Sequence, residues 1–436
     1  MWRRDFCKTL LALPAAAALY ASRTRGLPPL TIREVRTIKT GAGGRYQWVF
    51  VKILTSEPGL YGLGSASNVH QAMTVAASIE HHLGPFWVGR SADRIEDMWH
   101  ATNFRSYRRN SVIQNNVLSA LDMALWDIKG KRAGMPVYEL LGGKARDAVP
   151  VYGHAIGRDA AEVEEDVRKY MERGYRHVRA QLIHVGGYGG GGMVPPGQGS
   201  RPAQGFAGTA FDEEQYMETI PKLFEHLRVK LGTGVKLIHD VHEHLTPTMA
   251  LEFARRMEPY RMFFVEDILP PEHIDWFREI RQIASTPMAM GELFTSPREW
   301  VPLISERLID FIRCRISSVG GITAGRKIAS LCETFGVRTA WQEGGDNDPI
   351  NQLAGYHLDL ASSAFGIQED NRFPPLVHEM LPGTAQIKGG YLYGSDSPGL
   401  GVDLNEQVAA RYPLTPPSGA EDGTTQRGLD GSLVRP

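Results

Sequence analysis

Three acidic residues, Asp240, Glu266 and Glu292, follow one another at intervals of 26 residues. Each ends a short apolar run of the kind that forms a buried β-strand: Val235–Asp240, Met262–Glu266 and Met288–Glu292. The segments between these runs have helical spacing, so each interval has room for one strand, one helix and two loops. A single acid at the start of a loop is common and means little. Three in phase predict successive βα units of a parallel barrel, each with a carboxylate at the carboxyl end of its strand.

These three carboxylates predict a metal site. Gathered at one face of a barrel, they would repel one another unless a cation lies among them. Carboxylate oxygens are ligands that suit Mg²⁺. The carboxyl ends of the strands are also the face on which such barrels build their active sites. We therefore expect Mg²⁺ as a cofactor, bound by Asp240, Glu266 and Glu292.

Length and composition leave room for this architecture and exclude other classes. The chain has 436 residues, of which 42% are hydrophobic, enough for a barrel and a smaller domain. Its formal net charge is −1, and no basic block follows the first 25 residues, so nucleic-acid binding is unsupported. Cys7 lies near the amino terminus, and Cys314 and Cys332 have apolar neighbours typical of buried thiols.

The first 26 residues have the pattern of an export signal. Arg3 and Arg4 precede an apolar run from Thr9 to Leu19, which is too short to span a bilayer. The arginine pair resembles a twin-arginine signal, which predicts a periplasmic protein without a membrane span in its mature form. The alternative is a basic tail before an amphipathic helix.

The remainder divides into four segments. Residues 27–148 begin with two alternating strands, Leu30–Thr40 and Trp48–Thr55, and continue with helical patterns, which indicates an α+β domain. Residues 149–375 repeat strand and helix eight times, which predicts an α/β barrel. Residues 376–413 form a C-terminal segment, and 414–436 have the composition of a disordered tail. The candidate barrel strands are Val149–Tyr152, His177–Gln181, Val235–Asp240, Met262–Glu266, Met288–Gly291, Phe311–Arg315, Arg338–Trp341 and a weaker one near Leu360–Phe365.

One connection in the barrel is unusually long. Residues 185–208 are rich in glycine and proline and follow the second barrel strand. They lack the Gly-Lys-Ser/Thr of a phosphate-binding loop. A loop of this length is either functional, here as a lid over the active face, or disordered.

Several motifs in order carry a resemblance to a known family. Ala120–Lys129 with the following Gly130–Pro136 resembles the signature helix of the mandelate racemase/muconate lactonizing branch of the enolase superfamily. Further motifs resemble the mannonate dehydratase subgroup, which includes proteins described as starvation-sensing. These motifs are Val151–Ala155, Arg179–Gln181, Asp240–Glu243, Glu266–Asp267, Gly291–Phe294, Phe311–Arg313, Gly320–Thr323 and Gly366–Glu369. The resemblance covers residues 30–413.

The resemblance implies a fold and a reaction. The fold would be a modified (β/α)₈ TIM barrel with an α+β capping domain built from the N-terminal region and the C-terminal segment. The reaction would be Mg²⁺-dependent dehydration of an acid sugar such as mannonate or gluconate. Loss of the C2 proton and the C3 hydroxyl through a metal-stabilised enediolate would form a 2-keto-3-deoxy acid. Barrels of this family assemble as homo-oligomers, from dimers to octamers.

The resemblance also assigns catalytic roles. The base would be Tyr188 paired with Arg179, because a phenol with a pKa near 10 needs a neighbouring cation. The acid would be His242, two residues after Asp240 and therefore on the same side of an extended strand. A zinc site built from His239, His242 and His244 is the alternative, but His239 would point the other way and the carboxylates suit a harder metal. Predicted substrate contacts are Asn68, His154, Arg313, Gln342, Asp346 and Glu369.

Two departures from the family pattern affect the chemistry. The subgroup carries His-Gly after the seventh strand, whereas this chain has Gln342-Glu343. Glutamine forms hydrogen bonds but does not titrate, so Gln342 cannot act as a racemase base. Arg179-Ala-Gln181 also replaces the Lys-x-Lys of other members. A second hypothesis follows: a sugar-acid-binding homologue that keeps the metal site but has little dehydratase activity.

Overall fold

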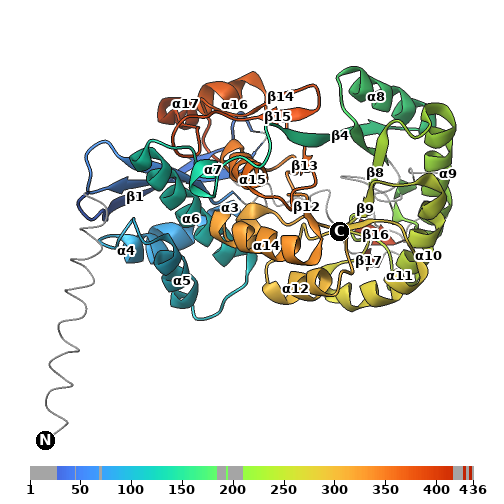
Figure 1. Ribbon diagram of the computed structural model, residues 1–436, viewed down its shortest axis with the longest axis horizontal. Coiled ribbons are helices and arrows are strands. Elements are labelled where there is room, and N and C mark those ends of the chain that lie inside the picture. The colour runs from blue at the N-terminus through green and yellow to red at the C-terminus, as the bar shows by residue number, and fades with distance from the viewer. Residues whose placement is uncertain are drawn as a thin grey trace, which may run out of the picture.

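The computed structural model describes residues 27–44, 46–67, 71–183, 193–194, 210–415, 426–428 and 432–434. Figure 1 shows a cap on one side of the molecule and an arc of barrel helices, α8 to α11, on the other. The two predicted N-terminal strands are confirmed, because β1 (Ile32–Thr40) and β2 (Trp48–Thr55) pair in antiparallel register.

A third cap strand was not predicted. β3 (Tyr61–Ser65) pairs with β2, although its sequence Tyr-Gly-Leu-Gly-Ser has the composition of a loop. Its glycines are explained by tertiary packing, since a Cβ at Gly64 would lie 1.9 Å from the Ala120 carbonyl oxygen. The long helix α6 (Val112–Ala133) therefore packs directly on the backbone of this strand. The other cap helices are α3 (Ala72–Ser78), a π-helical turn (Ile79–Leu83), α4 (Gly84–Trp87), α5 (Ile95–Arg105) and α7 (Val137–Leu140).

Eight parallel strands form the barrel. They are β4 (Val149–Gly157), β5 (His177–Leu182), β8 (Lys236–Asp240), β9 (Phe264–Glu266), β10 (Met288–Met290), β11 (Phe311–Ile312), β12 (Arg338–Thr339) and β13 (Gln368–Glu369). The first seven pair in chain order, and β13 pairs with β4. A bridge between Thr339 and Phe365 joins the seventh unit to the eighth. The predicted α/β barrel is therefore present.

The barrel helices alternate with the strands and cover their outer side. They are α8 (Ala160–Glu172), α9 (Glu213–Leu231), α10 (Pro247–Met257), α11 (Phe277–Ile283), α12 (Pro297–Ser305), α13 (Ile316–Val319), α14 (Ile322–Phe335) and α15 (Pro349–Ala361), with 3₁₀ turns at Glu258–Tyr260 and Pro271–Trp276.

The eighth strand was placed wrongly. It was expected near Leu360–Phe365, but α15 continues to Ala361 and the strand is Gln368–Glu369. Almost every residue of α15 is buried, so its apolar run has no exposed face to mark it as a helix. A short buried run of this kind cannot be assigned by periodicity.

The C-terminal segment returns to the cap. It contains α16 (Pro375–Met380), β14 (Gln386–Lys388), β15 (Tyr391–Tyr393) and α17 (Glu406–Ala410). β15 pairs with β4, and Thr40 of β1 forms a bridge with Pro413. Figure 1 shows α16 and α17 on the cap side of the molecule.

Part of the tail is also ordered. β16 (Gln426–Gly428) pairs with β17 (Leu433–Val434) and with β7 (Ala210–Phe211), which in turn pairs with β6 (Met193–Val194). The expectation of a disordered tail is wrong for these strand residues, because the strands offer the tail hydrogen-bond partners that composition does not reveal. The rest of the predicted lid, apart from the backbone of β6, lies outside the described residues.

Candidate active site

The barrel interior contains a hydrophobic layer. It consists of one inward-facing side chain from each of seven strands or their extensions: Tyr152, Ile238, Phe264, Ala289, Phe311, Ala340 and Ile367. Alternate residues of a strand face the same side, so the residues two positions later also face inward. These are His154, Asp240, Glu266, Gly291, Arg313, Gln342 and Glu369, and Arg179 joins them as the register partner of His154. A polar layer therefore follows the hydrophobic one at the carboxyl ends of the strands.

Arg179 binds three carboxylates of this polar layer. Its Nη1 atom lies 2.6 Å from Glu266 Oε1, 3.0 Å from Asp240 Oδ2 and 3.3 Å from Glu369 Oε1. Asp240 and Glu266 are register partners on neighbouring strands, which explains why one guanidinium group reaches both.

Arg313 connects the remaining carboxylates. It is fully buried, and its Nη1 donates to Glu292 Oε2 at 2.9 Å and to Asp267. Its Nη2 donates to Glu369 Oε2 at 3.0 Å, and its Nε lies 3.4 Å from Glu266 Oε2. Asp240, Glu266 and Glu292 thus belong to one network, in which two arginines supply the positive charge.

The network is unevenly neutralised. Burial, reinforced by the charge of Glu266, raises the pKa of Asp240 well above its usual value. Burial alone would raise the pKa of Glu369 too, but the charges of Arg313 and Arg179 together with the contact to His154 outweigh it, and the pKa is lowered. Five carboxylates share two guanidinium groups among these residues, which leaves excess negative charge that a divalent cation would offset.

The donor set therefore suits Mg²⁺ in charge and in atom type. In the described part of the chain, however, no three His, Cys, Asp or Glu side chains surround a common point closely enough to hold a metal. The reason is visible in the contacts: guanidinium groups lie between Asp240 and Glu266 and beside Glu292. Metal binding by the three carboxylates thus requires these side chains to converge.

His154 contributes to the same layer. Its Nε2 lies 3.1 Å from Glu369 Oε1, and its side chain retains 31% exposure while Glu369 is buried. His154 is therefore the partly accessible member of the pair at the barrel mouth.

The stated reason for placing His242 beside Asp240 is wrong. β8 ends at Asp240, and His242 and Glu243 have φ angles of 54° and 66°, so the chain turns instead of continuing as a strand. The backbone N–H of His242 donates to Asp240 Oδ1 at 2.8 Å. Burial lowers the pKa of His242, and the charges of Glu292 and Arg179 also act on it. The side chain is thus near the network, brought there by a turn.

The other histidines of this segment do not converge on a zinc site. His239 is buried on the outer side of β8, where Nε2 lies 2.7 Å from Tyr216 OH and Nδ1 lies 3.1 Å from the Ala180 carbonyl oxygen. It therefore faces away from His242, as the strand alternation predicted.

Asp346 lies in the loop after β12. Its Oδ2 accepts from Arg315 Nη1 at 2.6 Å, and its carbonyl oxygen accepts from the Trp48 indole N–H at 3.0 Å. These contacts give the carboxylate a structural partner and tie the loop to the cap, and its substrate role stays a prediction. Asn68 and Tyr188 lie outside the described residues.

Sequence reasoning missed two members of the network. Tyr152 is fully buried and donates from its hydroxyl to Glu266 Oε2 at 3.1 Å. Asp267 binds Arg313 and accepts from the Gly291 N–H at 2.9 Å. Their positions in the sequence could have indicated them, because Tyr152 lies two residues before His154 and Asp267 directly follows Glu266.

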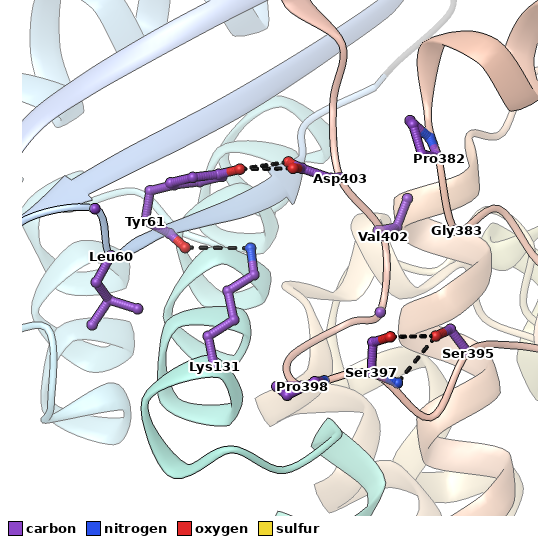
Figure 2. Close-up of a pocket in the computed structure, with 12 residues that line it drawn as sticks. Leu60, Tyr61, Lys131, Pro382, Gly383, Ser395, Ser397, Pro398, Val402 and Asp403 are labelled. Carbon is purple, nitrogen blue, oxygen red and sulfur yellow. Dashed lines mark hydrogen bonds between the residues drawn. The ribbon is translucent and has the colours of Figure 1, made fainter.

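A cavity of about 500 Å³ lies elsewhere, between the cap strands, α6 and the C-terminal segment. Figure 2 shows its polar groups bound to one another: Tyr61 to Asp403, Lys131 to the Tyr61 carbonyl oxygen, and Ser395 to Ser397. None of the barrel network residues lines this seam cavity. Among the described residues, no helix combines the length and apolarity needed to cross a membrane.

A capped parallel barrel with a carboxylate-rich layer at its mouth defines a class of enzyme fold, and comparisons with known proteins specify it. Residues 28–142 match the mandelate racemase/muconate lactonizing enzyme N-terminal domain, and residues 162–408 match the enolase C-terminal domain-like family. The chain belongs to the mandelate racemase/muconate lactonizing branch of the enolase superfamily, with relatives in the D-galactonate dehydratase family. The family resemblance and the fold predicted from the sequence are confirmed.

Individual relatives are similar over nearly their whole length. A D-galactonate dehydratase family member from Paenibacillus sp. (strain JDR-2) is 50% identical, with 93% of this chain and 98% of that protein covered. One from Musicola paradisiaca is 46% identical, with 93% and 99% covered. The crystal structure of an enolase from Pantoea ananatis with bound D-gluconate and Mg is 46% identical, has a TM-score of 0.88, and matches over 93% of this chain and 100% of that one.

The prediction of export to the periplasm is overturned by these relatives. The matches span 98–99% of the relatives' own lengths but 93% of this chain, so the relatives have no room for a leader of 26 residues. A twin-arginine pattern is short and arises readily by chance, which explains the wrong prediction. Residues 1–26 lie outside the described residues.

Proposed function

We propose that the protein is a Mg²⁺-dependent acid-sugar dehydratase that converts an aldonic acid to a 2-keto-3-deoxy acid. Removal of the C2 proton and departure of the C3 hydroxyl release water and leave an enol, which tautomerises to the ketone. The observation that carries this proposal is the buried polar layer of carboxylates and arginines at the barrel mouth. Relatives named D-galactonate dehydratase family members and the D-gluconate and Mg of the Pantoea ananatis structure support it.

Asp240, Glu266 and Glu292 would hold the metal. Their oxygens provide a hard, anionic donor set, and the carboxylates of the network outnumber its arginines. When bound, Mg²⁺ supplies positive charge that offsets the negative charge developing on the substrate carboxylate.

The chain's own residues would move the protons. We propose Tyr188 as the base that takes the C2 proton, with Arg179 as the neighbouring cation that makes its phenolate accessible. Arg179 is held by Asp240 and Glu266, so its charge stays near the reaction centre. His242 would donate a proton to the C3 hydroxyl as it leaves.

Substrate contacts would come from the rest of the polar layer and its loops. These residues are Asn68, His154, Arg313, Gln342, Asp346 and Glu369. Of the described members, Arg313, Gln342 and Glu369 are at least 98% buried, so they are shielded from competing water. We further propose mannonate, gluconate or galactonate as the substrate, and a homo-oligomeric assembly, which light scattering after size exclusion would test.

The experiment is a screen of aldonic and uronic acids with purified protein and Mg²⁺. We expect at least one acid to give a semicarbazide-reactive 2-keto product, and removal of Mg²⁺ by EDTA to abolish it. Silence across the panel, together with stabilisation by one of the acids, would instead support the second hypothesis of a sugar-acid-binding homologue.

The variant Gln342→His adds information on the departure from the family. If the glutamine is a simple loss, histidine should raise the dehydration rate on mannonate or gluconate. An unchanged or lower rate would mean that the pocket has been rebuilt around the amide.

A further inference from the structure

Two glutamines at the barrel mouth have unusual surroundings. Gln181 and Gln342 are 4% and 2% exposed, respectively. Within the described part of the chain, the buried Nε2 of Gln181 and the buried Oε1 of Gln342 have no hydrogen-bond partner. An unsatisfied buried amide is costly, so an amide of this kind that faces the barrel mouth is placed where a ligand can complete its hydrogen bonding.

Both side chains face the barrel interior. On β5, Val178, Ala180 and Leu182 pack in the core around the helices, so Arg179 and Gln181 face inward. In the extension of β12, Ala340 belongs to the interior layer and Trp341 to the outer core, so Gln342 faces inward as well. The Gln342 N–H donates to the Cys314 carbonyl oxygen at 3.2 Å, which continues the strand pairing up to this residue.

The Gln342 side chain packs closely against the loop that follows it. A Cβ at Gly344 would lie 2.4 Å from Gln342 Nε2, so the amide nitrogen packs against the glycine backbone. The oxygen is the end left without a partner. The Gln-Glu-Gly-Gly sequence therefore provides space that a larger residue at 344 would remove.

The two amides flank one half of the barrel mouth. Around the barrel, β5 and β12 are separated by β4 and β13, which contribute His154 and Glu369. The proposed metal ligands come from β8, β9 and the end of β10, on the other half. A substrate whose carboxylate meets the metal ligands would direct the rest of its chain toward the amide half.

We infer that Gln181 and Gln342 form a specificity-determining pair that reads the hydroxyl groups of the substrate chain. Gln181 donates an N–H to a hydroxyl oxygen, and Gln342 accepts from a hydroxyl through Oε1. Both groups are neutral, so they discriminate between hydroxyl configurations without adding a titrating group to the site. The inference rests on the proposed function. It assigns a role to Gln181, which replaces the second lysine of the Lys-x-Lys motif of other family members.

The test uses Gln181→Met and Gln342→Met, which keep side-chain length and remove the amide. We expect KM for the acid that is turned over to rise about tenfold to a hundredfold in each, with kcat changed less. Preference between epimeric acids should fall. Gln181→Asn and Gln342→Asn retain an amide but withdraw it, and should raise KM too.

Gln352→Met is the matched control. Gln352 is also fully buried, and its Oε1 likewise has no partner among the described residues, but it lies on α15 outside the barrel, where its Nε2 donates to the Asn371 carbonyl oxygen at 2.8 Å. We expect it to leave KM and epimer preference unchanged. Thermal unfolding of every variant separates misfolding from altered recognition.

The outcomes separate this inference from the proposed function. Turnover by the wild type, with unchanged KM and epimer preference in both methionine variants, would overturn the inference alone. If the wild type is stabilised by D-gluconate with Mg²⁺ but is inactive, the dehydratase proposal fails, and loss of that stabilisation in the variants still supports the inference. Absence of both turnover and stabilisation across the panel overturns both.

Discussion

The two halves of the barrel mouth differ in how their buried polar groups are satisfied. In the charged half, Asp240, Glu266 and Glu292 are bound to Arg179 or Arg313. In the amide half, Gln181 and Gln342 retain buried atoms without partners among the described residues. A buried charge needs an opposite charge nearby even before a ligand binds. A buried neutral amide without a hydrogen-bond partner costs less free energy. This difference supports the two proposals, that the charged half holds a cation and that the amide half recognises the neutral part of the substrate chain.

The largest expected effect comes from the charged half. Asp240→Asn removes a proposed metal ligand and should lower kcat by about 10²- to 10³-fold. Steady-state kinetics and Mg²⁺-dependent thermal stabilisation would measure it. Asp403→Asn, in the seam cavity of Figure 2, is the control and should leave both quantities unchanged. Full activity in Asp240→Asn would contradict the assignment of the two halves.

Arg313→Met tests whether the charged half depends on its internal cation for stability. Loss of this buried guanidinium leaves four carboxylates without it, so the free energy of unfolding should fall by about 3–5 kcal/mol. Urea denaturation measures the change. Arg278→Met breaks an exposed pair with Glu306 and should have no measurable effect. Equal results for the two arginines would show that the network is not a buried electrostatic unit.

Buried residues of the cap contact the barrel beside each half, and one of those beside the charged half titrates. Asp122 of α6 accepts from the Thr323 N–H at 2.9 Å, beside the loop after β11. Burial raises the pKa of Asp122 to about 7. The folded state then holds a proton that the unfolded state releases, so stability should fall as pH rises from about 4 to about 7, by up to about 4 kcal/mol.

Asp122→Asn isolates this contribution. Between pH 4 and pH 7, the unfolding free energy of the variant should fall less than that of the wild type. Urea denaturation at each pH measures the difference. An identical pH profile for the wild type and the variant would mean that Asp122 keeps its ordinary pKa.

The smallest expected effect concerns the cap contact beside the amide half. Trp48→Phe removes the indole N–H that binds the Asp346 carbonyl oxygen and should cost about 1 kcal/mol of stability. Because that loop follows Gln342, KM should rise as well. Trp87→Phe loses a comparable bond to Thr102 Oγ1 within the cap and should cost similar stability without any change in KM. A rise in KM in both variants, or in neither, would contradict the prediction that the Trp48 contact affects substrate binding by the amide half.

Particular residues show how far the sequence could be interpreted. The spacing of Asp240, Glu266 and Glu292 predicted the barrel and the face on which they lie, because strand alternation and unit length are local properties. The same logic failed at His242, where the backbone turns, and at the eighth strand, where a fully buried helix has no periodic exposed face. The catalytic and substrate-binding roles assigned to individual residues remain predictions, and two of these residues, Tyr188 and Asn68, also lie outside the described residues.

By itself, the sequence determined the family, the capped barrel and the set of carboxylates, since motifs and periodicity are written along the chain. Only the tertiary structure decided which groups neutralise those carboxylates. Arg313 reaches Glu369 across 56 positions, and Tyr152 reaches Glu266 across 114. The tertiary structure also decided that Gln181 Nε2 and Gln342 Oε1 have no hydrogen-bond partner among the described residues. Whether a buried polar atom has a partner depends on side chains that meet only after folding, and no local pattern encodes that meeting.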